Sequence, residues 1–548
     1  MFDVANQLLS EAERLFSEEK FDQVLQVLST MKKKQNLSSE DWLCSQILKA
    51  RALGALGRSK EILEFVESAL MMSQKLNIPT RELELYDIMS TTLFTLGNHE
   101  EAIYKAEQAE YRIKMLDEEP ALEILRSKGS LLHTKGTSYM VQGQLEQGER
   151  ALSQALTLRR KIKDKYGTAD SLAHTGVLHI LKGKINQGIE FLKQGLELFK
   201  ELKNNEGTAK CIHNIAWAYS LKGELDRSLD YNQQSLAFAE QIGNQQHIAN
   251  SLQSIGETYQ RKGNLDQALK YMQKALKLKK RIGNNFWIAF TLHPLIELCV
   301  DNNLFDLAHQ YLQDFETLDS SREELNVNHK LRLCKAITLR ANRSKDSDLS
   351  VLGFSSLHRV LERYVKSQTL LRDLIAEQVV DHNVTSSAIF NLCELLLVEL
   401  KTLGNEDVLT EVNVLSDQLI RIAQDQNVYP LLAKSYLLKA KLALLKPAPD
   451  QTRDLLSKAQ AIAQEKGYDR LALVISNEQK QLAGDLPNWI LEENFSLSDR
   501  INKIRLESLV VSLRQNRVES YTGEMPDRPT MDELTAFAQQ LDKRKFEW

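Results

Sequence analysis

A pattern that recurs every forty residues is the feature of this sequence that most constrains its fold. Four consecutive units align without gaps, at residues 127–166, 167–206, 207–246 and 247–286. Each unit has a glycine at the same position: Gly143, Gly183, Gly223 and Gly263. A period of this length is typical of helical repeats, in which one unit buries its apolar face only against its neighbours. A chain of 548 residues is also too long for a single hydrophobic core of ordinary size, so we expect an array of helix pairs.

The residues of the repeat predict its local structure. The shared glycine separates two segments of helical periodicity, and it supplies the positive φ that ends one helix and turns the chain back. Small residues such as Gly136 and Gly148 let helix backbones approach closely, while a ring (Tyr139) and a leucine (Leu156) fill the spaces between helices. Proline is scarce and strand-like runs are nearly absent. The sequence therefore predicts an all-α solenoid of about 10–11 helical hairpins.

The repeat becomes less regular toward both ends, which predicts three regions. We expect a regular array over 1–320, a degenerate helical block over 321–514, and a tail over 515–548 with a short helix starting after Thr530. In the last unit of the array Asn303 replaces the glycine, and Pro294 is expected to kink or break the first helix. The remaining repeats of the array are predicted near 5–40, 41–80, 81–126 and 287–320.

Composition excludes several classes of function. The 70 basic and 74 acidic residues nearly balance, whereas a nucleic-acid binder normally has a basic surplus. The five cysteines are more than thirty residues apart, so neither CxxC motifs nor a disulfide framework is expected. We find no signal peptide and no segment of about 20 apolar residues, and we expect a cytoplasmic protein without membrane contact. Nucleotide, metalloprotease and hydrolase motifs are also absent from the sequence, so we predict no enzyme activity and no cofactor.

Histidines and basic runs offer two further candidates. His133, His213 and His293 are spaced by 80 residues, but helices pack about 8–10 Å apart, so equivalent residues two repeats apart cannot share one ion. We predict no metal site from them. The basic runs at 158–165 and 277–284 are expected on the solvated ends of second helices, with contact to an anionic partner as the alternative.

The order of small residue, tyrosine, glycine, alanine and Ala-Leu (Ala275-Leu276 in the fourth unit) resembles the tetratricopeptide repeat (TPR). The unit is six residues longer than the common form and lacks its proline, and so is similar to the long repeats of kinesin light chain and spindle-orientation adaptors. Residues 388–482 resemble the C-terminal half of large archaeal TPR-array proteins. The resemblance implies a right-handed superhelix whose first helices line a concave groove.

Partner-binding residues are predicted on the groove-facing side of two first helices. These residues are Lys210, His213, Asn214, Trp217, Asn250, Gln253, Ser254, Glu257 and Arg261. In the adaptor-type repeats an asparagine at the place of Asn214 clamps a peptide backbone, but the neighbouring units have His174 and Ser254 there. Trp217 is a candidate because tryptophan is enriched among binding hot spots, with packing between repeats as the alternative. The same face of earlier units includes His133, Asp170 and His174.

The function that follows is a scaffold or adaptor that binds a peptide segment or a partner domain in the groove. One alternative is a ligand-sensing or peptide-sensing regulatory module that acts on a separate effector. Another is a self-assembling oligomer, or a tail over 530–548 that docks in a groove of its own or a neighbouring chain.

Overall fold

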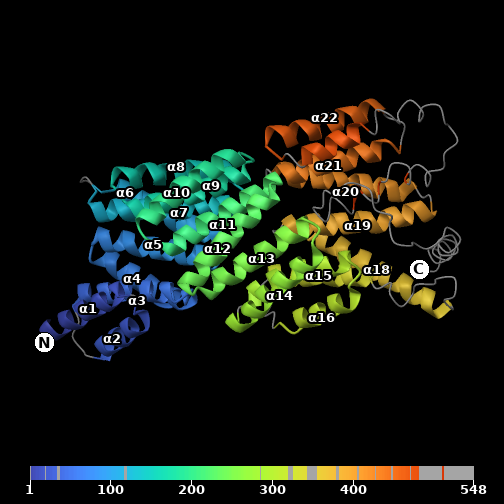
Figure 1. The fold of residues 1–548 in the computed structure, drawn as a ribbon. Coiled ribbons are helices and arrows are strands. Elements are labelled where there is room, and N and C mark those ends of the chain that lie inside the picture. Colours follow the sequence, from blue (N-terminus) through green and yellow to red (C-terminus); the bar gives the residue numbers. More distant parts are fainter. Residues whose placement is uncertain are drawn as a thin grey trace. The chain divides into compact units, whose positions relative to one another are not determined.

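The computed structural model describes most of the chain as helix. The described residues are 2–18, 20–33, 38–116, 120–283, 285–318, 325–341, 354–377, 382–403, 406–425, 428–445, 449–468 and 471–480, with the single residues 501, 506, 509 and 510. Within these ranges there are helices and turns but no strand, which confirms the predicted all-α class (Figure 1). The predicted tail at 515–548, with its short helix after Thr530, lies outside the described residues.

Residue contacts divide the chain into two compact units. The first comprises Met1–Lys182 and Asn186–Cys211, and the second comprises Gly183–Ile185 and Ile212–Trp548. This division reflects how the helices pack. The region boundaries near 320 and 514 rest on the regularity of the repeat in the sequence, and they stay predictions. Helix α11 (Asn205–Lys222) is divided between the two units.

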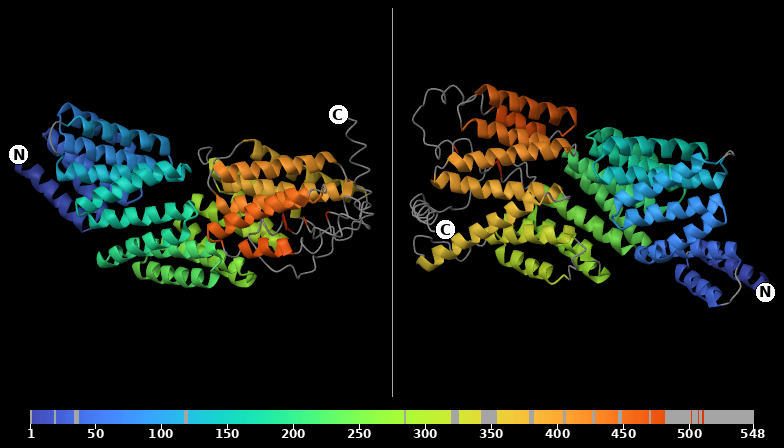
Figure 2. Two further views of the ribbon diagram at one scale, coloured as in Figure 1. Left: turned by 90° about the horizontal axis from the view of Figure 1, so that it is seen from above. Right: turned by 180° about the vertical axis from the view of Figure 1, so that it is seen from behind.

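The first unit is a stack of antiparallel helix pairs (Figure 2). Its helices are α1 (Phe2–Ser17), α2 (Phe21–Lys33), α3 (Ser39–Ala55), α4 (Ser59–Lys75), α5 (Pro79–Thr95), α6 (His99–Lys114), α7 (Leu122–Val141), α8 (Leu145–Lys161), α9 (Lys165–Leu181) and, apart from its first residue, α10 (Ile185–Glu201). From α1 to α9 each helix contacts the next, and each odd-numbered helix also contacts the next odd-numbered one. The odd-numbered helices therefore form a layer against which the even-numbered helices pack.

The second unit, taken by itself, is also built of helices that pack against their neighbours in sequence. Its helices are α12 (Leu225–Ile242), α13 (Gln245–Arg261), α14 (Leu265–Ile282), α15 (Asn285–Asp301), α16 (Phe305–Glu316), α17 (Leu325–Ala341), α18 (Phe354–Ala376), α19 (His382–Leu403), α20 (Glu406–Asp425), α21 (Tyr429–Ala443) and α22 (Pro449–Glu465). Consecutive helices contact each other from α12 to α22, and α15, α17 and α19 also contact one another in order. None of the described helices is both long and apolar enough to cross a bilayer.

Glycine turns join the helices as the repeat predicts. Gly143 and its three equivalents have φ between 71° and 83°, a range that non-glycine side chains rarely adopt. Asn303, which takes the glycine's place in a later unit, has φ 59° because asparagine tolerates this conformation better than most residues. The predicted role of this position is confirmed in all five units.

The small residues of the repeat allow backbone-to-backbone contact between paired helices. A Cβ atom on Gly176 would lie 2.8 Å from the carbonyl oxygen of Gly188 and 2.7 Å from Cγ of Leu192. The ring position stacks on a second ring twelve residues later, at His179–Phe191, Tyr219–Tyr231 and Tyr259–Tyr271, with centroids 5.0–5.6 Å apart. These contacts account for the small residues and the rings that recur at these positions of the repeat.

Of the kink or break expected at Pro294, the break does not occur, because α15 continues through it from Asn285 to Asp301. Proline removes one helical hydrogen bond, but its neighbours Leu292, Leu295 and Ile296 are fully buried. Burial of three large aliphatic side chains stabilises the helix by several kcal/mol, roughly 1.5–3 kcal/mol each, which exceeds the local loss.

Candidate functional site

The predicted binding residues of the second unit form a half-buried strip on two odd-numbered helices. We call His213, Asn214, Trp217, Asn250, Gln253, Ser254, Glu257 and Arg261 the polar strip; all eight are half-buried. No residue is fully exposed along 212–222 of α11 or 246–261 of α13, whereas α12 and α14 each have an exposed stripe. Lys210 differs from the strip, because it is exposed, belongs to the first unit, and pairs with Glu206 at 2.7 Å.

Gln253 is committed to contacts within the fold. Its Oε1 accepts hydrogen bonds from Lys279 Nζ at 2.6 Å and from Thr291 Oγ1 at 2.9 Å, and its Nε2 donates to Glu257 at 2.8 Å. The amide thereby joins α13 to α14 and α15. We infer that Gln253 supports the strip rather than contacting a partner.

Arg261 places positive charge at one end of the strip. It donates a hydrogen bond to Ser220 Oγ at 2.6 Å, which ties α13 to α11. Lys434 of α21 lies close to it, and burial, together with the charge of Arg261, lowers the pKa of Lys434 to about 7. At this end the strip favours a negatively charged group.

Asn214 and Trp217 have side-chain polar groups that make no hydrogen bond to the described part of the chain. Among the described residues, neither side chain makes a hydrogen bond or an ion pair, although both are half-buried. The nearby His213 is neutral at physiological pH, because burial and His247 lower its pKa to about 4. A bound ligand can supply the hydrogen-bond partners that this amide and this indole N–H lack.

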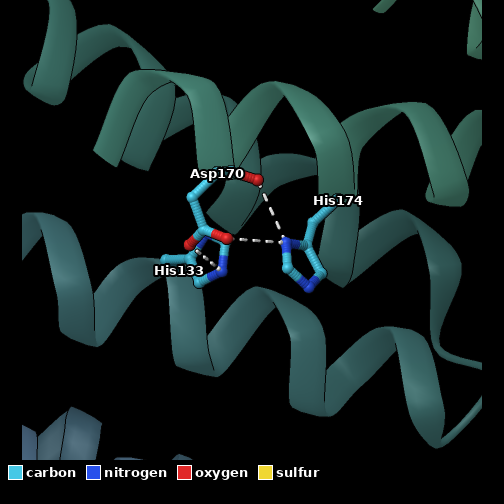
Figure 3. A group of neighbouring side chains, drawn as sticks. All are labelled: His133, Asp170 and His174. Atoms are coloured by element: carbon cyan, nitrogen blue, oxygen red, sulfur yellow. Dashed lines mark hydrogen bonds and ion pairs between the residues drawn. The ribbon is translucent and has the colours of Figure 1, made fainter. Parts of the chain in front are cut away.

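The first unit contains a second cluster on its odd-numbered helices, made of His133 from α7 and of Asp170 and His174 from α9 (Figure 3). His133 Nε2 lies 3.1 Å from one Asp170 carboxylate oxygen, and His174 Nδ1 lies 3.5 Å from the other. Burial lowers the pKa of His133 to about 3. Burial opposes ionisation of Asp170, but His133, His174 and Arg159 hold its pKa below the usual value.

Sequence reasoning named these three residues as groove-facing but did not bring them together. The available signal was the spacing of Asp170 and His174 by four residues, which places them on one helix face. His133 lies one repeat earlier at nearly the same position, so the adjacent helix brings its ring beside them. Their ligand atoms all lie within 4.8 Å of one another.

Two cations of the basic runs are buried, contrary to the expected solvated face. Arg159 and Lys279 are only 6% and 2% exposed, although they do lie at the ends of second helices as predicted. Arg159 donates to the carbonyl of Gly167 and to Ser171 Oγ, both at 2.8 Å. Burial lowers the pKa of Lys279 to about 8, against a smaller opposing effect of Glu257. The two cations are three repeats apart and stand at the same position of the unit.

Comparison with known proteins identifies the repeat. Two tetratricopeptide-repeat family models match, at residues 176–241 and 249–281. None of the curated protein sequences compared with the chain matches it.

Solved structures with similar folds include three kinds of helical-repeat protein. A Rap protein complexed with competence and sporulation factor is 14% identical, with a TM-score of 0.45 over 69% of this chain and 100% of its own. A STAND protein with a tetratricopeptide repeat sensor from Pyrococcus horikoshii is 14% identical, with a TM-score of 0.45 over 66% of this chain and 54% of its own. TPR-like repeats of a kinesin light chain from Podospora anserina are 18% identical, with a TM-score of 0.30 over 37% of this chain and 97% of their own. At these values the similarities assign neither a ligand nor a partner to this chain.

Proposed function

Because this chain carries tetratricopeptide repeats, we propose that it is a protein-interaction module that binds an extended peptide segment of a partner. The segment lies across the polar strip of α11 and α13 in the second unit. The observation that carries the proposal is the pair Asn214 and Trp217, half-buried and without hydrogen-bond partners among the described residues.

The chemistry of the pair suits a peptide. The Asn214 amide can donate to a backbone carbonyl and accept from a backbone N–H at once. Trp217, one turn further along α11, offers a large apolar surface with an N–H at its edge, the kind of side chain that dominates binding energy in a recessed site.

Charge at the end of the strip suggests which peptide is preferred. Arg261 and the nearby Lys434 favour a carboxylate, from an Asp or Glu side chain or from a peptide C-terminus. We therefore propose that the bound segment carries a carboxylate close to the part that covers Trp217, because Arg261 bonds to Ser220, three residues further along α11. Binding rather than catalysis is the proposed activity, and we propose that it takes place in a reducing cytoplasm.

The test is selection of peptides from a random display library on the purified full-length chain. Affinities of the selected peptides are then measured by fluorescence anisotropy for wild type, Trp217→Ala and Asn214→Ala. We expect losses of at least about tenfold in both variants, as for hot-spot residues. Tyr111→Ala, which removes an aromatic ring that is 63% exposed on α6, is the matched control and should bind as wild type.

Helicity and melting of each variant are recorded by circular dichroism. If Trp217→Ala melts far below wild type, then Trp217 belongs to the hydrophobic core. In that case peptide binding by Asn214→Ala is the test of the proposal. The proposal fails if no peptide is enriched, or if folded Asn214→Ala binds the selected peptides as tightly as wild type.

A further inference from the structure

The three side chains His133, Asp170 and His174 have the donor types of a transition-metal site. Two imidazole nitrogens and one carboxylate oxygen are the ligand set that zinc and similar borderline ions prefer, whereas calcium and magnesium prefer oxygen alone. All three residues belong to the first unit.

The distances fit one small ion with little movement. Ligands at about 2.1 Å in a tetrahedron lie about 3.4 Å apart. In the structure His133 Nε2 lies 3.1 Å from one Asp170 carboxylate oxygen, and His174 Nδ1 lies 3.5 Å from the other. One ligand atom from each of the three residues lies within 4.8 Å of the other two, and Figure 3 shows both histidine nitrogens facing the carboxylate.

The surroundings provide both anchoring and access. Ser171 Oγ lies 3.4 Å from Nδ1 of His133, so it can orient the ring whose Nε2 faces Asp170. The side chains of His174 and Asp170 are 35% and 31% exposed, so an ion can enter from solvent. With three protein ligands, a fourth position stays open to water or to a group of a bound molecule.

Two contacts are expected to weaken the binding of a metal ion at this cluster. Arg159 Nη1 lies 3.6 Å from the Asp170 carboxylate, so its charge repels a cation there. His174 Nδ1 also lies 3.0 Å from the backbone carbonyl of Asp170, a contact that is lost if this nitrogen binds the ion. Arg159 donates hydrogen bonds to the carbonyl of Gly167 and to Ser171 Oγ, which hold it in place.

We propose that His133, Asp170 and His174 form a binding site for one divalent transition-metal ion of the zinc class, with an open coordination position at the surface of the odd-numbered helices. The site adds to the proposed peptide binding and does not depend on it.

The experiment is a calorimetric titration of zinc chloride into the full-length chain after chelator treatment, repeated for four variants. Wild type should bind one ion per chain with micromolar affinity, and cobalt should give the absorption spectrum of a four-coordinate ion. Asp170→Asn and His174→Ala should each weaken binding by at least about tenfold. His174→Cys keeps a zinc ligand at the position and should retain binding.

The control is His309→Ala. His309 is half-buried on α16, and its Nδ1 lies 2.8 Å from the carbonyl of Phe305, the same local contact that His174 makes. This variant should bind zinc as wild type does. A wild-type chain that binds no ion, ligand variants that bind as tightly as wild type, or an equal loss in His309→Ala would each overturn the proposal.

Discussion

Replacing the buried Lys279 by methionine tests the energetics of the junction between α13, α14 and α15. The ammonium is 2% exposed, and burial lowers its pKa from 10.5 to about 8 in the folded chain. The difference is about 2.5 pKa units, and each unit corresponds to about 1.4 kcal/mol, so the charged lysine destabilises the fold by about 3 kcal/mol at neutral pH. Methionine has a similar length and no charge, and Gln253 Oε1 keeps its hydrogen bond from Thr291.

The pH dependence has a definite sign. Between about pH 8 and 10.5 the folded chain has released the Lys279 proton while the unfolded chain still binds it, so the free energy of unfolding rises with pH in this window. Below about pH 8 the full destabilisation is present, and above 10.5 it disappears. Lys279→Met should therefore be more stable than wild type by about 1–3 kcal/mol at pH 7, and the advantage should shrink by about 2 kcal/mol at pH 10.

Urea unfolding followed by circular dichroism at pH 7 and pH 10 measures both quantities. Taking the difference between variant and wild type cancels the titration of all other groups. Lys280→Met, which removes the adjacent exposed lysine paired with Asp314 at 2.7 Å, is the control and should show no such dependence. A variant-minus-wild-type difference that is the same at both pH values would refute the reasoning.

Three further results are expected from simpler measurements. Gly176→Ala should lower stability by about 1–3 kcal/mol in thermal melts, because its Cβ would lie 2.8 Å from the Gly188 carbonyl oxygen; an unchanged melting temperature would contradict the close contact. Asn303→Gly should be tolerated while Asn303→Val should destabilise by roughly 1–3 kcal/mol, because φ is 59° there; equal melting of the two variants would argue against strain. In the native chain a thiol reagent should modify the half-buried Cys44 first, since the other four cysteines are fully buried; simultaneous modification of all five would contradict this order.

The forty-residue period predicted the parts of the fold that depend on local residue type. Gly143 and Asn303 are examples, because positive φ is a property of a few residue types and is visible in the sequence. The break allowed for at Pro294 does not occur, because α15 is stabilised by burying its own Leu292, Leu295 and Ile296, which a local rule does not include. Likewise, the sequence placed Asn214 and Trp217 on one face but could not show that their polar groups lack partners.

The buried cations show a signal that sequence reasoning missed. Positions 159, 199, 239 and 279 are equivalent in the repeat, and the two middle occupants, Phe199 and Ala239, are buried apolar residues. A register position occupied by phenylalanine and alanine predicts burial for every residue placed there. The basic character of the surrounding segments instead suggested solvent, because cations are favoured at helix C-termini.

The same position leads to opposite predictions for the two cations. Within the part of the chain that the structure describes, the carboxylate near Lys279, that of Glu257, makes no ion pair with it and only partly offsets the effect of burial on its pKa. Arg159 instead lies 3.6 Å from the Asp170 carboxylate and donates two hydrogen bonds at 2.8 Å to Gly167 and Ser171. Arg159→Met removes the charge-assisted bonds and leaves Ser171, which is fully buried, without its donor. We expect it to destabilise the chain by about 2–4 kcal/mol at pH 7 in urea unfolding, whereas Lys279→Met stabilises it. If both variants change stability in the same direction, then burial alone, and not the partners of each cation, determines the energy at this position.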